Sequence, residues 1–165
     1  METAEFYKEE IRCGWRVDEK TKRIWAVQLE MLDEVERICK KYGLKYFADS
    51  GTLIGAVRHQ GYIPWDDDID LAMLREDYET FLKVAPGELK EHLVLQTPYR
   101  EKNYLRAHAQ LRNSRTTGCS REDRKAGYNC GIFIDIFPLY LLCLFCFDLS
   151  KGFQITIKYN AILHW

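Results

Sequence analysis

The N-terminal part of the chain has the hydrophobic period of a helix. Between Val17 and Lys41 apolar side chains recur every three or four residues, with charged residues between them, and Gly43 follows as a stop signal. The recurring positions are Ile24, Val27, Met31, Val35 and Ile38. This spacing predicts an amphipathic helix that packs one face on the rest of the domain.

Shorter segments with alternating helix and strand character follow. "KYFADS" (45–50) predicts a strand, and "SGTLIGAVRH" (50–59) predicts a glycine-containing turn that opens a short helix. "REDYETFLKVA" (75–85) predicts a helix that stops at Pro86-Gly87. Three later segments predict strands: "HLVLQTP" (92–98), "YLRAHAQLRNS" (104–114) and "GIFIDIFPLY" (131–140). This order predicts an α/β or α+β domain whose sheet is covered by helices.

Composition and charge narrow the class of protein. With 165 residues, 47% of them hydrophobic and 13% aromatic, the chain is long and apolar enough for one domain with a real core. The net charge of −1 argues against a nucleic-acid-binding protein, although residues 100–125 are locally basic. The charged N-terminus "METAEFYKEEIRCGW" does not resemble a signal peptide, and no apolar run approaches the length of a spanning helix. We therefore expect a cytoplasmic protein without a transmembrane segment, whose contact with a membrane, if any, is peripheral.

Six cysteines are spread over the chain: Cys13, Cys39, Cys119, Cys130, Cys143 and Cys146. In a cytoplasmic protein of this size we expect reduced thiols rather than a disulfide framework. Cys143 and Cys146 form a single C-x-x-C within an apolar run, which is weak support for a zinc or redox site.

The chain contains no repeats and no low-complexity linker, so we expect a single domain over residues 1–165. Within it we distinguish an N-terminal helical part (1–43), a core (44–138) and a C-terminal tail (139–165). The tail begins with "LYLLCLFCFD", which is apolar but too short to cross a bilayer. The rest of the tail has little helical period or turn punctuation, and it looks like an incomplete ending.

The stretch "GYIPWDDDIDLAM" (61–73) carries the most distinctive chemistry. On a strand, Asp66, Asp68 and Asp70 would share one face, with Asp68 and Asp70 about 7 Å apart along the strand. Two unit charges about 4 Å apart repel by about 4 kcal/mol at an effective dielectric near 20, so such a cluster calls for a cation. Carboxylate oxygens without nearby histidine or cysteine suit Mg²⁺ or Mn²⁺, the ions of phosphoryl transfer.

Three alternatives compete with this metal site. The acids also fit the first ligands of an EF-hand calcium loop, but Leu71 stands where that loop needs a glycine, and Pro64 would interrupt the entering helix. The acids can also be solvated residues at a strand end. A carboxylate pair for acid catalysis, as in glycosidases, is the third alternative, although one strand supplying both acids suits a metal better.

The segment before the acids favours a phosphate site. In "DSGTLIGAVRH" (49–59), Gly51 and Thr52 stand where a strand meets a helix N-terminus, so free backbone N–H groups and a hydroxyl can hold a phosphate. Arg58 follows one or two helical turns later, and a salt bridge to one of the acids is its structural alternative. A glycine turn, an arginine and an acidic strand within twenty residues predict a site for a phosphorylated ligand.

The combined segment "FADSGTLIGAVRHQGYIPWDDDIDLAM" resembles the signature of the LicD family, the phosphocholine-transferase-like proteins related to fukutin and fukutin-related protein. This family lies within the nucleotidyltransferase-fold superfamily. The resemblance is close across residues 44–75 and continues more loosely through "LRNSRTT" (111–117) and "IFIDIFPL" (132–139).

The resemblance implies a nucleotidyltransferase-fold mixed sheet flanked by helices, with Asp68 and Asp70 as the paired acids, Asp66 joining them, and Asp135 as a third acid on a neighbouring strand. It also implies transfer of a phosphorylated alcohol, such as phosphocholine or ribitol phosphate, from a CDP-linked donor to a sugar hydroxyl. The acceptor would be a free or lipid-linked cell-surface glycan, for example lipopolysaccharide or teichoic acid, and CMP would leave.

Our leading hypothesis is therefore a phosphotransferase that depends on Mg²⁺ or Mn²⁺. Its catalytic residues would be Asp68, Asp70 and Asp135, its metal ligands these three and Asp66, and its substrate-binding residues Gly51, Thr52, Arg58, Arg112 and Arg115. A solvated helix or strand face is the alternative for Arg112 and Arg115, and a salt bridge to a helix arginine is the alternative for Asp135. The competing functions are a nucleotidyltransferase that releases pyrophosphate and a non-catalytic fragment that only binds the donor.

Overall fold

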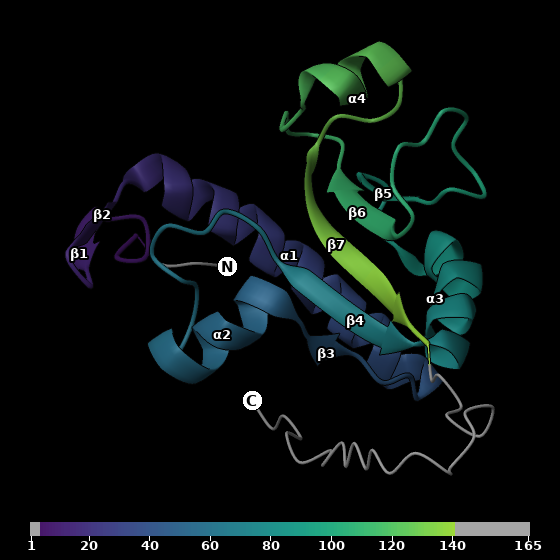
Figure 1. Ribbon diagram of the computed structural model, residues 1–165, viewed down its shortest axis with the longest axis horizontal. Coiled ribbons are helices and arrows are strands. Elements are labelled where there is room, and N and C mark those ends of the chain that lie inside the picture. Colours follow the sequence, from purple (N-terminus) through teal and green to yellow (C-terminus); the bar gives the residue numbers. More distant parts are fainter. Residues whose placement is uncertain (1–3, 141–165) are drawn as a thin grey trace, which may run out of the picture.

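The computed structural model describes residues 4–140 (Figure 1). Its helices are α1 (Glu19–Tyr42), α2 (Ser50–His59), α3 (Arg75–Glu88) and α4 (Arg121–Ala126). Its strands are β1 (Glu10–Arg12), β2 (Trp15–Val17), β3 (Phe47–Ala48), β4 (Asp70–Leu74), β5 (Leu93–Gln96), β6 (Ala109–Asn113) and β7 (Ile132–Leu139). Strands β3 to β7 form one sheet in the order β3-β4-β7-β6-β5, in which β4 and β7 are parallel and the other neighbours are antiparallel. The prediction of a mixed sheet with flanking helices is confirmed.

Helices α1 and α3 pack on one face of the sheet and enclose the core, and the opposite face of β7 is turned toward the viewer in Figure 1. The strands contribute Leu71, Met73, Ile134 and Ile136 to this core, and the two helices contribute Met31, Val35, Ile38, Tyr78, Phe81 and Ala85. Because successive side chains of a strand point to opposite faces, the alternate residues Asp70 and Asp135 belong to the other face of the sheet. The apolar pattern of β4 and β7 thus decides where these carboxylates point.

Helix α1 forms where the sequence predicts it. The Asp18 side chain accepts a hydrogen bond from the Thr21 N–H at 2.8 Å and caps the first turn. At the other end Gly43 takes the left-handed conformation (φ 66°), and its N–H donates to the Cys39 carbonyl. Of the predicted apolar stripe, Met31, Val35 and Ile38 lie in the core and Val27 packs against it, as the period indicates, whereas Ile24 is half-buried outside this cluster.

Two predicted boundaries are wrong. Helix α3 does not stop at Pro86 but continues to Glu88. Proline lacks the N–H that would donate to the carbonyl of Leu82, four residues earlier, and Arg100 Nη2 donates to that carbonyl at 3.4 Å instead. Strand β6 begins only at Ala109, so the first half of the segment 104–114 is not part of the ladder.

Two elements were not predicted. The part of the chain before α1 contains the hairpin β1–β2, where Cys13 and Gly14 both have positive φ (53° and 75°), as the tight turn between two strands requires. The short helix α4 begins at its N-cap Ser120, which accepts a hydrogen bond from the Asp123 N–H at 3.0 Å. Both elements are too short to show a hydrophobic period.

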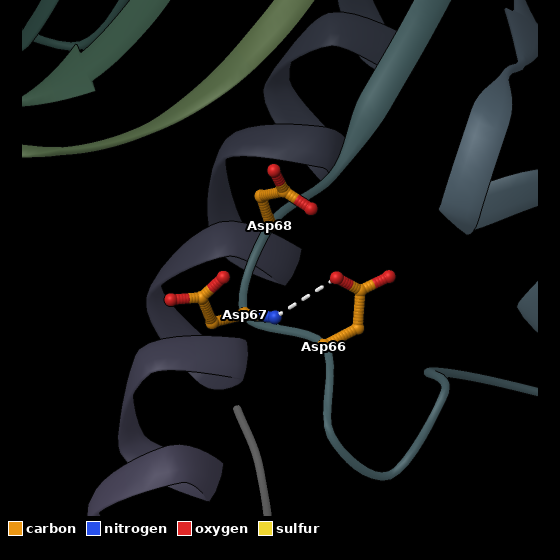
Figure 2. A group of neighbouring side chains, drawn as sticks. All are labelled: Asp66, Asp67 and Asp68. Atoms are coloured by element: carbon orange, nitrogen blue, oxygen red, sulfur yellow. Dashed lines mark hydrogen bonds between the residues drawn. The ribbon is translucent and has the colours of Figure 1, made fainter.

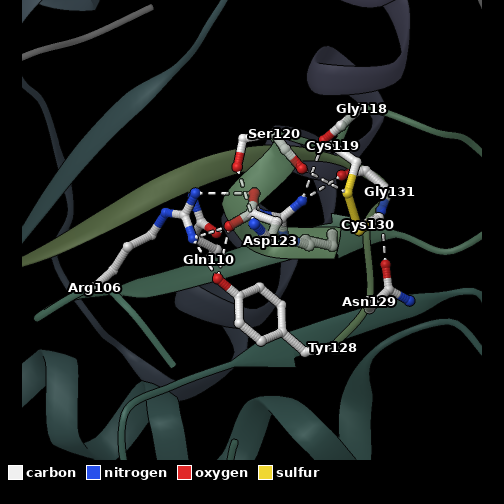
Figure 3. The surroundings of a disulfide bond; sticks show 11 residues. Arg106, Gln110, Gly118, Cys119, Ser120, Asp123, Tyr128, Asn129, Cys130 and Gly131 are labelled. Atoms are coloured by element: carbon white, nitrogen blue, oxygen red, sulfur yellow. Dashed lines mark hydrogen bonds and ion pairs between the residues drawn. A yellow bond between two sulfur atoms is a disulfide. The ribbon is translucent and has the colours of Figure 1, made fainter. Parts of the chain in front are cut away.

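The expectation of reduced thiols is wrong for one pair of cysteines. Cys119 and Cys130, whose Cα atoms lie 4.8 Å apart, form a disulfide that closes the segment around α4 (Figure 3). The backbone at its base is also paired, because the Gly118 N–H donates to the Cys130 carbonyl at 2.7 Å. The composition alone did not show that these two positions meet.

Among the described residues, none of the helices has the length and apolar character needed to cross a membrane. Cys143, Cys146 and nearly all of the predicted tail (139–165) lie outside the described residues.

Candidate active site

Strands β4 and β7 bring the two strand carboxylates side by side. In their parallel ladder Asp70 is the register partner of Asp135, and the Asp135 N–H donates to the Ile69 carbonyl at 2.9 Å. Each of Asp68, Asp70 and Asp135 places one carboxylate oxygen within 4.8 Å of the others. The structure thus brings together the three acids predicted to be catalytic, although they come from segments more than sixty residues apart.

The first three acids of the cluster lie in a loop, not on a strand. Strand β4 starts only at Asp70, so the prediction that Asp66, Asp68 and Asp70 share a strand face is wrong in that detail. The reason is that α1 binds the backbone of this loop: Trp25 Nε1 donates to the Asp66 carbonyl at 2.9 Å, and Gln28 Nε2 donates to the Asp67 carbonyl at 2.7 Å. These carbonyls are therefore not available for a strand ladder.

Asp66 belongs to a second, overlapping carboxylate group with Asp67 and Asp68, again within 4.8 Å. Figure 2 shows the three side chains fanning out from the loop beside α1, with the Asp67 N–H donating to Asp66 Oδ1 at 3.2 Å. Asp66 is thus linked to the group of Asp70 and Asp135 through Asp68, and the four predicted metal ligands do not form a single group. Asp67, which the sequence did not single out, joins them.

Helix α2 begins directly beside the acids. A Cβ atom on Gly51 would lie 2.5 Å from Asp66 Oδ2, so the glycine leaves room for that carboxylate in its present position. Thr52 Oγ1 accepts a hydrogen bond from the Asp70 N–H at 2.8 Å. Both predicted phosphate-turn residues therefore border the acids, and Thr52 also fixes the first residue of β4.

The electrostatics of this region disfavour ionised carboxylates. Burial raises the pKa of Asp68 to about 7, and the charges of Asp70, Asp66 and Asp67 add to the shift. Burial together with the charges of Asp135, Asp49 and Asp66 raises the pKa of Asp70 to about 6. Like charges that cannot all ionise without cost are stabilised by a bound cation.

The donor set fits a hard divalent cation. Every member of the two groups offers carboxylate oxygen, the ligand that Mg²⁺ and Mn²⁺ prefer, and the oxygens are close enough to converge on one ion. Asp68, Asp70 and Asp135 come from two adjacent strands and the loop before one of them, which holds them in fixed relative positions. These residues would hold the cation.

The three arginines predicted to contact phosphate lie in different environments. Arg58 is exposed in the last turn of α2, where its Nε donates to His59 Nε2 at 3.0 Å. Arg115 is exposed just beyond the end of β6. Arg112 is 0% exposed and its guanidinium donates to carbonyls, to Gln110 and to Asp123 inside the protein. We therefore do not assign a phosphate contact to Arg112, because a buried guanidinium with these partners cannot reach a ligand.

Two residues of the site, His108 and Gln110, were not predicted from the sequence. His108 Nε2 lies 2.9 Å from Asp135 Oδ1, and Gln110 Nε2 donates to the same oxygen at 2.7 Å. These are the hydrogen-bond partners of the half-buried Asp135, in place of the helix arginine considered from the sequence. A signal for them exists in "RAHAQLR" (106–112), where polar and apolar residues alternate with the period of a strand that presents one polar face.

A cavity of about 880 Å³ opens beside the acids and runs along α1. Gly51, Thr52, Asp66 and Asp68 of the site are among its lining residues. Most of the remaining wall is apolar and includes Leu29, Leu32, Leu44, Tyr46, Tyr62, Ile63 and Leu71. Asp66 and Asp68 therefore border a space large enough for a small organic ligand, whereas Asp70 and Asp135 do not line it.

Comparison with known proteins places this site in a family. Residues 43–141 match the family described as LicD/FKTN/FKRP, nucleotidyltransferase domain. The lipopolysaccharide cholinephosphotransferase LicD of Haemophilus influenzae is 46% identical over 71 residues, which cover 43% of this chain and 27% of that protein. An uncharacterised protein of Rickettsia typhi is 42% identical over 73 residues (44% of this chain, 22% of that protein). The human ribitol 5-phosphate transferase FKRP is 49% identical over 35 residues (21% and 7%).

The chain thus matches only about a quarter of the length, or less, of these curated relatives. The family match nevertheless extends from the end of α1 through β7 and includes all the acids of the site. The paired acids, the glycine turn beside them and this match lead to one conclusion: the chain belongs to the LicD family, as its nucleotidyltransferase domain.

Proposed function

We propose that this domain is the catalytic part of a phosphotransferase that moves a phosphorylated alcohol from a CDP-linked donor to a hydroxyl group of a cell-surface glycan. The observation that carries the proposal is the convergence of Asp68, Asp70 and Asp135 at the sheet. It is supported by two relatives whose names describe transfer of phosphocholine to lipopolysaccharide and transfer of ribitol 5-phosphate. Action in the cytoplasm, on a free or a lipid-linked glycan, stays a prediction.

The three carboxylates are proposed to hold Mg²⁺ or Mn²⁺. When bound, such a cation offsets the negative charge of a pyrophosphate group and of the phosphoryl-transfer transition state. The first turn of α2 adds backbone N–H groups next to the acids, and Arg58 in its last turn is an exposed cation for the donor. The described residues therefore combine acids for a cation with groups for a phosphate.

The chemistry requires a base for the acceptor hydroxyl. We assign this role to a carboxylate of the group, which orients the hydroxyl and takes up its proton as the oxygen attacks the phosphorus that carries the alcohol. A new oxygen–phosphorus bond forms, the bond from this phosphorus to the bridging oxygen breaks, and CMP leaves with the bonding electron pair. The alcohol phosphate is then attached to the glycan.

The test is a product analysis with donors labelled in the alcohol phosphate. The protein is incubated with CDP-choline or CDP-ribitol, with CTP in a parallel reaction, with and without Mg²⁺, and with glycan acceptors. Label on the acceptor together with released CMP, only in the presence of Mg²⁺, is the expected result. Asp70→Asn should abolish transfer, whereas Glu76→Gln, which removes an exposed carboxylate of α3, should not.

Other outcomes identify the competing functions. Release of pyrophosphate from CTP would overturn the proposal in favour of a nucleotidyltransferase. Binding of the CDP-linked donor without turnover by this chain, with transfer by a C-terminally extended form, would show that these residues are a donor-binding fragment of the enzyme.

A further inference from the structure

Gln110 connects the candidate active site to a buried ion-pair network. Gln110 is the register partner of Asp135 across β6 and β7, just as Asp135 is the partner of Asp70 across β7 and β4. The Gln110 side chain is 1% exposed, and its Nε2 donates to Asp135 Oδ1 at 2.7 Å. Its Oε1 accepts from Arg112 Nη2, also at 2.7 Å.

Arg112 fixes the orientation of the Gln110 amide. A guanidinium can only donate hydrogen bonds, so the amide oxygen of Gln110 must face Arg112. The NH₂ group must then face Asp135, where it can only donate to the carboxylate. The opposite orientation would place two donors against each other and two acceptors against each other, both of them buried.

Arg112 is itself held from several sides. Its Nη1 donates to the Gly131 carbonyl at 2.8 Å, its Nη2 lies 3.3 Å from Asp123 Oδ2, and its guanidinium carbon lies 4.6 Å from the centre of the Phe133 ring. Asp123 in turn accepts hydrogen bonds from Arg106 and Tyr128 (Figure 3). The network therefore anchors Gln110 to α4 and to the segment closed by the disulfide.

Both side-chain hydrogen bonds to Asp135 are made to Oδ1, one from Gln110 and one involving His108. Within the described residues, Oδ2 makes no side-chain hydrogen bond, and one carboxylate oxygen of Asp135 lies within 4.8 Å of oxygens of Asp68 and Asp70. We propose that Gln110, oriented by Arg112, is a positioning residue that fixes the Asp135 carboxylate so that its other oxygen can bind the cation of the active site. This inference rests on the proposed function, because it requires that the carboxylates hold a cation.

The test compares Mn²⁺ affinity, measured by the electron paramagnetic resonance signal of free Mn²⁺, for two matched variants. Gln110→Met keeps the length of the side chain and removes the donor to Asp135. Gln96→Met is the control, since Gln96 lies beside Gln110 on β5 and is also 1% exposed, but has no hydrogen bond to the acids. We expect Gln110→Met to weaken Mn²⁺ binding by about 10- to 100-fold, the usual effect of removing a group that orients a metal ligand. Gln96→Met should leave Mn²⁺ affinity unchanged.

The wild-type protein supplies a second readout that needs no variant. In a ¹⁵N-resolved NMR spectrum, the side-chain NH₂ signals of Gln110 should shift when Mg²⁺ is added, whereas those of Gln96 should not. This measurement tests the positioning role of Gln110 if Gln110→Met fails to fold.

The outcomes separate the two proposals. Absence of Mn²⁺ binding to the wild-type protein would overturn the proposed function and this inference with it. Mn²⁺ binding that is equally tight in the wild-type protein and in Gln110→Met, or Gln110 signals that do not respond to Mg²⁺ although the metal binds, would overturn the positioning role alone.

Discussion

Two acidic sites of the structure have opposite electrostatics: the half-buried carboxylates of Asp68, Asp70 and Asp135 at β4 and β7, and the buried Asp123 on α4. At the first, Asp68, Asp70 and Asp135 converge on each other, and burial and mutual repulsion raise the pKa of Asp68 and of Asp70. At the second, burial opposes ionisation of Asp123, but hydrogen bonds and charges from Arg106, Tyr128 and Arg112 outweigh it and hold the pKa of Asp123 well below its ordinary value.

The difference lies in the partners, not in burial. Asp123 is the more deeply buried acid, at 1% exposure, and two arginines match its charge. The Asp68, Asp70 and Asp135 carboxylates have no arginine or lysine in their salt bridges among the described residues, only the contact of Asp135 with His108. An acid that forms ion pairs with arginine side chains stabilises the fold. Acids that lie close together without such partners are arranged to bind a metal cation.

Removing Asp123, the acid that is paired with two arginines, should have the largest effect on stability. Asp123→Asn leaves the guanidinium of Arg112 buried without its counter-charge, and breaking a buried ion pair in this way costs about 3–5 kcal/mol. Urea unfolding of the metal-free protein measures the loss. The neighbouring Glu122→Gln, an exposed residue of the same helix, is the control and should change the free energy of unfolding little.

Asp68 and Asp70, which have no arginine or lysine partner among the described residues, should make the metal-free protein less stable as the pH rises. The folded-state pKa values of Asp68 and Asp70, about 7 and about 6, lie above the ordinary 3.8, so between pH 4 and 7 the folded protein holds protons that the unfolded chain has lost. The stability that these bound protons give to the folded protein is complete below pH 4 and is lost as the pH rises through 6 and 7. We expect the free energy of unfolding to fall by about 1–2 kcal/mol, a value reduced to allow for the solvent contact of these half-buried groups. Unfolding experiments at a series of pH values measure this change. A stability that increases over this range would contradict the account.

Asp70→Asn isolates one of these repelling charges. Without metal, the variant should be more stable than the wild-type protein by about 1 kcal/mol at pH 8, and its stability should depend less on pH. Melting temperatures at pH 5 and pH 8 measure both effects. Destabilisation by the mutation at pH 8 would mean that Asp70 is needed for the fold, as Asp123 is.

The smallest effect is expected at Gly51. In Gly51→Ala, the new Cβ would displace the carboxylate end of Asp66, which can turn away, and alanine favours the helix. We expect a change in the free energy of unfolding below about 1 kcal/mol, measured by urea unfolding. A large loss would show that the Asp66 carboxylate has a fixed place in the fold.

The sequence predicted those parts of the molecule that repeat a pattern. The apolar period of α1 and the continuous apolar run of β7 are long enough to be read directly, and the acids and the glycine turn were found because they are concentrated in one segment. The placement of Asp135 beside Asp70 came from a family resemblance, because no local pattern states which strands become neighbours.

The misses come from pairings that only the folded chain shows. Arg112 looked like one member of a basic region, but the burial of β6 places it against Asp123 and Gln110. The start of β4 at Asp70 depends on Trp25 and Gln28, which bind the preceding loop from α1. The contacts of Trp25 and Gln28 join residues 41 and 39 positions apart, and those of Arg112 depend on which face of β6 is buried. A hydrophobic period contains no information about either.

Direct measurement of Mn²⁺ binding to the purified protein tests the central claim, that Asp68, Asp70 and Asp135 form a cation site. Free Mn²⁺ is titrated at pH 8 against the wild-type protein, Asp70→Asn and the control Glu76→Gln. The account predicts binding to the wild-type protein and to Glu76→Gln, and an affinity lower by more than about 100-fold in Asp70→Asn, since loss of a ligand should exceed the effect of losing a supporting residue. Equal Mn²⁺ affinity in all three proteins would contradict it.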